Sequence, residues 1–141
     1  MNIQELSVGD LVLIDGKPTK IDAVHQKKVG WHSRPDRLKW TRVGQVYPVD
    51  ITPELLVRYG FIRSEDCDHY AEFVWCDEED SYMAIVQFRF YKESVCGVNT
   101  LLRIERNFAG GVDKFHCCNM EHFHQLQQAI RLCKINKKIE V

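Results

Sequence analysis

Residues 81–92, SYMAIVQFRFYK, alternate with a period of two, and this pattern constrains the fold more than any other feature of the chain. In an extended strand, successive side chains point to opposite faces. One face would then carry a continuous apolar set: Tyr82, Ala84, Val86, Phe88 and Phe90. We expect this strand to belong to an antiparallel β-meander of four strands: residues 70–76, 81–92, 100–107 and 112–118. The acidic run at 77–80 is predicted to be a solvated turn.

Residues 52–61 carry the clearest helix signal. Thr52 can cap a helix with its hydroxyl, Pro53 suits the first helical position, and Glu54 complements the positive end of the helix dipole. Gly60 can end the helix in a left-handed conformation. The sequence therefore predicts a helix of about two turns at 53–59.

A second helix is predicted over about 119–133, with Asn119 as its N-cap. Its buried stripe would consist of Phe123, Leu126, Ile130 and Cys133. At about 100° per residue, His122 lies beside this stripe and His124 points toward solvent. A last short strand is expected at 139–141.

The N-terminal segment predicts a β-hairpin. A strand at 11–14 is followed by Asp15-Gly16, a pair that suits a tight turn, and then by a partner strand at 21–24. This pattern resembles the first hairpin of small SH3-like barrels and KOW modules. The polar and basic residues 25–37 are predicted to form a loop, and residues 38–49 a strand.

Together these elements predict an α+β fold: a twisted, mostly antiparallel sheet with an SH3-like N-terminal portion, one short helix, and a C-terminal helix packed on the sheet. We expect a single domain over 1–141. Its predicted parts are the SH3-like portion at 1–50, the short helix at 51–61, and the meander with the C-terminal helix at 62–141.

Composition supports a globular protein. Hydrophobic residues make up 45% of the 141 residues, which is enough for a core. The chain has no apolar run long enough to cross a membrane and no visible secretory signal, so we expect a cytoplasmic protein. Its six cysteines contain no CxxC pair, and in a reducing compartment they are expected to be free thiols.

The net charge of −1 conceals two oppositely charged segments. Residues 17–42 carry eight cations and two anions, whereas residues 50–80 carry ten anions and two cations. Either these segments meet or both are solvated, or the basic one is a binding face for an anionic partner.

Three segments resemble a known group of proteins: LSVGDLVL (6–13), VYPVDITPELLVRYGF (46–61) and FHQLQQAIRL (123–132). In this order they are similar to a family of short uncharacterised proteins from gut bacteria of the Bacteroidales type and from their phages and mobile elements. The resemblance implies a common fold and a mobile-element setting, but no activity. The family pattern keeps the HQLQ element without the double cysteine, so Cys117 and Cys118 depart from it.

The segment FHCCNMEHFHQL (115–126) concentrates potential metal ligands. Strand alternation sends His116 and Cys118 to one face, and His122 can approach them, with a fourth ligand from His69 or Cys76. A structural zinc site needs four such ligands in a tetrahedron. The favoured interpretation is a strand-to-helix junction with packed thiols, so no cofactor is expected.

The sequence shows no complete set of catalytic residues. A cysteine nucleophile with a histidine base is conceivable at Cys117 or Cys118, but no motif indicates an oxyanion hole or an orienting group. Gly110-Gly111 is too short for a phosphate-binding loop and precedes no helix. We therefore expect that the protein is not an enzyme.

The basic segment interleaves cations with aromatic residues, a combination that can neutralise phosphates and stack on unpaired bases. The candidate nucleic-acid-binding residues are Lys17, Lys20, Lys27, Lys28, Trp31, His32, Arg34, Arg37 and Lys39. Trp40 is assigned to the core. The favoured function is a non-catalytic protein-interaction or assembly module of a phage or mobile element, which binds a partner protein or itself. A nucleic-acid-binding module is the alternative, and no membrane association is expected.

Overall fold

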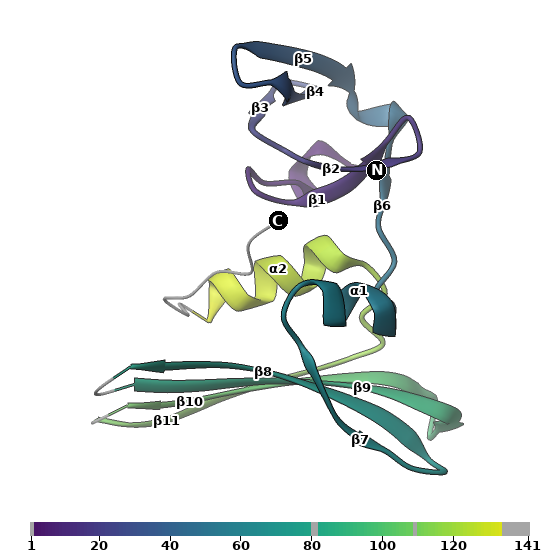
Figure 1. The fold of residues 1–141 in the computed structure, drawn as a ribbon, viewed down its shortest axis with the longest axis vertical. Coiled ribbons are helices and arrows are strands. Elements are labelled where there is room, and N and C mark those ends of the chain that lie inside the picture. Colours follow the sequence, from purple (N-terminus) through teal and green to yellow (C-terminus); the bar gives the residue numbers. More distant parts are fainter. Residues whose placement is uncertain (1, 80–81, 109, 134–141) are drawn as a thin grey trace. The chain divides into compact units, whose positions relative to one another are not determined.

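The computed structural model describes residues 2–79, 82–108 and 110–133, and antiparallel strands dominate this part of the chain (Figure 1). The strands pair in three sheets and are accompanied by two α-helices, which confirms the α+β prediction. The elements are η1 (Ile3–Glu5), β1 (Leu11–Ile14), β2 (Lys17–Lys20), β3 (Ala23–His25), β4 (Lys28–Arg34), β5 (Arg37–Arg42), η2 (Val43–Gln45), β6 (Val46–Pro48), α1 (Pro53–Arg58), β7 (Ile62–Asp66), β8 (Tyr70–Glu79), β9 (Tyr82–Val95), β10 (Val98–Phe108), β11 (Gly111–Cys118) and α2 (Phe123–Leu132).

The described residues form two compact units. One contains those of 1–50 together with 122–128, and the other contains those of 51–121 together with 129–133. The predicted single domain and its internal boundaries stay a prediction. The strand predicted at 139–141 lies outside the described residues.

The first sheet has the order β2-β1-β6 and begins with a tight hairpin. Asp15 and Gly16 have φ angles of 51° and 73°, as a two-residue type I′ turn requires. The partner of β1 is therefore β2, and the prediction of a partner strand at 21–24 is wrong. A two-residue turn lets pairing resume at once at Lys17, and Pro18 is tolerated because β2 is an edge strand.

The second sheet has the order β3-β4-β5. The loop predicted at 25–37 is wrong, because β4 occupies its centre and pairs on both sides. Charged residues are compatible with these strands since one face of the sheet is solvated. The strand predicted at 38–49 is interrupted: β5 ends at Arg42, and η2 separates it from β6.

Both small sheets share one hydrophobic core. It consists of Leu6, Val12, Ile14, Ile21, Val29 and Val46, with Ile3, Trp31 and Val43 packed against it. Backbone hydrogen bonds from Gly9 N–H to Ile21 O and from Ile21 N–H to Asp10 O tie the connection after β2 back to the start of β1. The two sheets thus stabilise each other through a common interior.

Helix α1 forms as its local signals predict. The Leu55 N–H donates to Thr52 Oγ1 at 3.1 Å, Pro53 occupies the first turn, and Gly60 has a φ of 98°. Leu56 is buried, and the Phe61 N–H donates to its carbonyl at 2.9 Å. Phe61 then stacks on Trp75 of β8 with ring centroids 6.3 Å apart.

The third sheet is a five-stranded antiparallel meander with the order β11-β10-β9-β8-β7, visible as the long ribbons of Figure 1. Its buried face carries Phe73, Trp75, Ala84, Val86, Phe88, Leu102 and Ile104. The period-two prediction for the central strand is therefore confirmed for Ala84, Val86 and Phe88, while Phe90 is half-buried and the side chain of Tyr82 lies outside the described ones. The prediction of a solvated turn at 77–80 is wrong for Asp77 to Glu79, which continue β8, and Asp77 is only 4% exposed; Asp80 lies outside the described residues.

The junction between β11 and α2 differs from its prediction. Asn119 has a φ of 58° and binds the start of β10, where its Oδ1 accepts from Asn99 N–H and its Nδ2 donates to Gly97 O. Helix α2 starts later, at Phe123, and the Gln125 side chain accepts from His122 N–H in the manner of a capping box. His124 is 2% exposed, so its predicted exposure is wrong.

No helix among the described residues combines the length and the apolar character that crossing a membrane requires.

Candidate functional site

The outer face of the sheet β3-β4-β5 (from here on, the outer face) presents an unusual set of side chains. Directly paired residues of antiparallel strands share a face. Gly30 pairs with Trp40 and His32 pairs with Leu38, so these four residues form two adjacent rows. Leu38 and Trp40 are 39% and 46% exposed, which leaves apolar and aromatic surface open to solvent.

Trp40 lies over the backbone of Gly30. A Cβ atom added at Gly30 would come within 3.2 Å of Trp40 Cζ3, and the ring meets His25 edge-on with centroids 6.4 Å apart. The assignment of Trp40 to the core is therefore wrong. Its strand faces the hydrophobic core with alternate residues only, and Trp40 falls on the other set.

Cations flank this aromatic centre. Lys28 and Arg42 pair directly at one end of the β4–β5 ladder, and Arg34 and Arg37 pair at the hairpin tip. All four are exposed, and none forms an ion pair with the described residues of its own unit. Like charges in directly opposite positions destabilise a strand pair, so an anion bound between Lys28 and Arg42 would relieve a repulsion.

Other predicted site residues lie elsewhere. Trp31 is partly buried against the hydrophobic core, on the side of the sheet opposite to Trp40, and Lys39 places its Nζ 5.5 Å from the centre of the Trp31 ring. Lys17 and Lys20 belong to β2 in the other sheet of this unit. The structure thus brings together only part of the predicted set on the outer face.

His32 has a defined partner. Its Nδ1 lies 2.8 Å from Asp22 Oδ2, and the same oxygen accepts from His32 N–H at 2.9 Å. These hydrogen bonds lower the pKa of the Asp22 carboxyl below its usual range. Asp22 therefore stays ionised near neutral pH and fixes the orientation of the His32 ring at the margin of the outer face.

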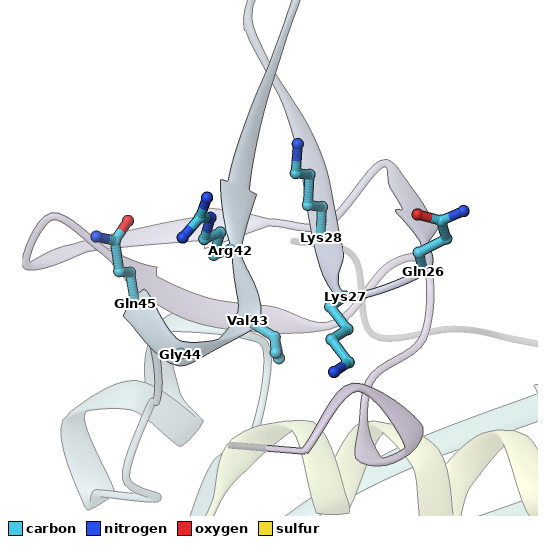
Figure 2. A pocket seen from close by; sticks show the side chains of 7 residues that line it. All are labelled: Gln26, Lys27, Lys28, Arg42, Val43, Gly44 and Gln45. Atoms are coloured by element: carbon cyan, nitrogen blue, oxygen red, sulfur yellow. The ribbon is translucent and has the colours of Figure 1, made fainter.

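A pocket of about 650 Å³ lies at the base of the β4–β5 hairpin (Figure 2). Its polar lining consists of three cations and two amides: Lys27, Lys28, Arg42, Gln26 and Gln45. Figure 2 shows the side chains of Lys28 and Arg42 extending to the same side and that of Lys27 to the opposite side. None of the described residues that line the pocket is a carboxylate, so the charges of this described lining are all positive.

Two carboxylates of the acidic segment 50–80 form ion pairs with cations of the same unit. The Glu72 carboxylate accepts hydrogen bonds from Arg89 Nε at 2.8 Å and from Ser64 Oγ at 2.9 Å. Burial alone would raise the pKa of Glu72, but these two hydrogen bonds prevail and lower it. Asp66 pairs with Lys92 at 2.8 Å.

The predicted metal ligands are placed less favourably. On β11, His116 and Cys118 are exposed while Phe115 and Cys117 are half-buried, as strand alternation predicts. His122 has Asp50 as its neighbour, with Nδ1 and Oδ1 3.3 Å apart. Among the described residues, no three or more His, Cys, Asp or Glu side chains are grouped to hold a metal ion, and all six cysteines are free.

Sequence reasoning missed several residues of the outer face and its pocket: His25, Gln26, Leu38, Trp40, Arg42 and Gln45. One signal for Trp40 was present in the sequence. In a strand, residues 38, 40 and 42 lie on one face and residues 39 and 41 on the other. The position of Gly30 opposite Trp40 depends on the register of β4 and β5, which no local pattern specifies.

Comparisons of the chain with family models, with curated proteins and with solved structures find no significant match.

Proposed function

We propose that this chain is a non-catalytic binding module that holds single-stranded nucleic acid on the outer face. The observation that carries the proposal is Trp40, a half-exposed indole in the centre of a sheet face with exposed cations beside it. Aromatic side chains stack on bases of any identity, and cations follow the phosphate backbone. The outer face combines both within one hairpin.

The proposal favours single strands over duplexes. A base can stack on Trp40 only if it is free of its own stacking neighbours, as in single-stranded DNA or RNA. Leu38, in the row next to Trp40, extends the apolar surface on which a second base can rest. A duplex would present only phosphates to this face.

Two further points belong to the same proposal. Residues 1–50 form two three-stranded antiparallel sheets around one core, which supports an SH3-like relationship for this part. The resemblance of three segments to short proteins of Bacteroidales phages and mobile elements supports a mobile-element setting in the cytoplasm of a bacterial host.

The test is binding of a fluorescent oligothymidylate of about 12 nucleotides, measured by anisotropy at low and moderate salt. Replacing Trp40 by Ala should weaken binding about 5- to 150-fold, since a stacked base contributes about 1–3 kcal/mol. Trp40→Phe should retain most of the affinity. Absence of binding by the wild-type protein at low salt would refute the proposal.

Tyr47→Ala is the matched control. Tyr47 is also an exposed aromatic residue of this unit, 62% exposed, but it belongs to β6 in the other sheet. Its removal should leave the affinity unchanged. Equal losses from Trp40→Ala and Tyr47→Ala would mean that the outer face has no special role.

Self-association is a second candidate, and β11 favours it. This strand is an edge of the five-stranded sheet, none of its eight residues is buried, and Val112 is exposed. The opposite edge, β7, has five residues, of which Arg63, Glu65 and Asp66 are charged, whereas β11 has eight, of which Asp113 and Lys114 are charged, and charges discourage pairing with another chain. An open β11 can accept a strand from a second molecule.

The oligomeric state, measured by light scattering after size-exclusion chromatography, tests this candidate. If β11 pairs with a second copy, Val112→Lys should convert dimers to monomers, because a charged side chain protects an edge. Ile62→Lys on β7 is the matched control and should leave the dimer intact. A wild-type protein that is monomeric at high concentration would rule self-association out.

A further inference from the structure

We propose that the pocket at the base of the β4–β5 hairpin binds a phosphate group of the same nucleic-acid strand whose base stacks on Trp40. This inference rests on the function proposed above and adds a subsite to it. The pocket would supply the anchoring contact, and the indole would supply the stacking contact.

The described lining of the pocket is positively charged. Lys28 and Arg42 are opposite each other in the ladder and have no anionic partner among the described residues of their unit. Two cations held in this way raise the electrostatic potential between them and attract an anion. Arg42 can donate two hydrogen bonds to one phosphate, and Lys28 adds a compact charge.

Neutral polar side chains also line the pocket. Gln26 and Gln45 each bring an amide, which can donate to phosphate oxygens without adding charge. In Figure 2 the Gln45 side chain extends toward the same side as that of Arg42. A Cβ atom added at Gly44 would meet no atom within 4 Å, so the backbone of η2 leaves the pocket open at this point.

Geometry links the pocket to Trp40. Arg42 follows Trp40 by two residues on β5, and Lys28 precedes Gly30 by two on β4, so both cations project from the outer face. Two residues along a strand span about 7 Å. This separation lets one flexible strand place a base on the indole and a nearby phosphate in the pocket.

Lys27 provides an internal comparison. It lines the same pocket and has the same charge as Lys28, but Figure 2 shows its side chain on the opposite side of the hairpin. Its backbone carbonyl accepts a hydrogen bond from Val43 N–H at 2.9 Å, a contact that a side-chain substitution preserves. We expect the side chain of Lys27 to contribute little to the bound phosphate.

The experiment compares the wild type with Lys28→Gln/Arg42→Gln and with Lys27→Gln, using the same oligothymidylate. The double variant should lose at least about tenfold in affinity, whereas Lys27→Gln should stay near the wild type. If both cations hold one phosphate, the slope of log K against log salt should decrease by about 0.7, the value for one contact on a single strand.

Stability provides an independent readout. Inorganic pyrophosphate, compared with chloride at equal ionic strength, should raise the Tm of the wild type but not that of the double variant. Without ligand, the Tm of the double variant should equal or exceed that of the wild type, because a repulsion is removed. A variant that fails to fold would show a lower Tm and would contradict this account of the repulsion.

Two oligonucleotides that differ only in a 5′-phosphate distinguish a terminal phosphate from a backbone phosphate as the bound group. Tighter binding of the phosphorylated form, lost in the double variant, identifies a terminal phosphate. Equal binding of both forms, weakened in the double variant, identifies a backbone phosphate. Either result supports a phosphate subsite.

Two outcomes overturn the inference. If Trp40→Ala abolishes binding while Lys28→Gln/Arg42→Gln binds like the wild type, the subsite is refuted and the proposed function survives. If polyglutamate binds the pocket and the oligonucleotides do not, the partner is an acidic protein, and both the subsite and the nucleic-acid function fail.

Discussion

The side chain of Gln127 holds the backbone of Leu11 across 116 positions of sequence: its Oε1 accepts a hydrogen bond from the buried Leu11 N–H at 2.8 Å. The same amide donates through Nε2 to Gly9 O at 3.1 Å. Gln128 continues this contact, because its Nε2 donates to Asp10 Oδ2 at 2.8 Å.

This contact links the start of the first strand to the helix α2. The Gly9-Asp10 pair directly precedes the first strand, and Gln127 and Gln128 of α2 bind to it. Buried backbone groups need partners, and here the helix supplies them through side chains. Replacement of either element alone would leave the other with unpaired polar groups.

Gln127→Ala should therefore destabilise the protein by about 1–3 kcal/mol, since the buried Leu11 N–H loses its acceptor. Urea denaturation followed by circular dichroism measures this change. Gln125→Ala on the same helix is the control, because its side chain accepts from the exposed His122 N–H at the start of α2. A loss from Gln127→Ala no larger than that of the control would contradict the role of the contact.

The cap of α1 permits a second stability test. Thr52→Ala should cost about 1 kcal/mol, because the Leu55 N–H loses its side-chain acceptor. Thr52→Ser retains a hydroxyl at the same position and should remain close to the wild type. Equal denaturation midpoints for Thr52→Ala and Thr52→Ser would show that the cap contributes nothing.

His124 predicts a dependence of stability on pH. Burial lowers the pKa of this imidazole below its usual 6.5, as does the nearby His122, while the charges of Asp10 and Glu5 oppose the shift. Its Nδ1 has no hydrogen-bond partner among the described residues. As the pH falls below about 6.5, the unfolded chain takes up a proton that the folded chain does not, so the free energy of unfolding decreases.

The measurement is the free energy of unfolding between pH of about 7.5 and about 5.5, for the wild type and for His124→Leu. The variant should lose part of the pH dependence, because it has no imidazole to protonate. His116→Gln, at an exposed position of β11, should retain the wild-type profile. Parallel profiles for the wild type and His124→Leu would show that His124 does not cause the effect.

Helix α1 and the meander could be predicted because their signals are local. Thr52, Pro53 and Gly60 each act within one turn of the helix, and the alternation around Phe88 needs only a strand with one buried face. The N-terminal strands were harder to predict. β4 contains Lys28, Gly30 and Arg34, which indicate a loop unless the partners on both sides are known.

The errors at His124 and Trp40 have a common cause. The predicted stripe of α2 covers one face, whereas buried residues extend around the helix from Phe123 and Leu126 to His124 and Gln127. For Trp40, residue type suggested burial, but the register with β4 decides on which face the indole lies. Both facts depend on pairing and packing that a single sequence does not specify.

The contact between Gly30 and Trp40 leads to the last prediction. A Cβ atom at Gly30 would lie 3.2 Å from both Ala23 Cβ and Trp40 Cζ3. Ala23 is fixed in β3, whereas the half-exposed indole can move outward, so Gly30→Ala should displace Trp40 from the sheet. We expect a stability loss of about 1–3 kcal/mol, the usual cost of a small overpacking change.

Tryptophan emission and oligothymidylate binding detect this displacement. The emission of Trp40 is obtained by difference from Trp40→Phe. Gly30→Ala should shift this emission to longer wavelength, because the indole becomes more exposed. Affinity should fall since the stacking surface is no longer held by the sheet. Gly44→Ala is the matched control for the emission only, because an added Cβ there meets no neighbour but Gly44 lines the proposed phosphate pocket. Unchanged emission and affinity in Gly30→Ala would mean that the position of Trp40 does not depend on Gly30.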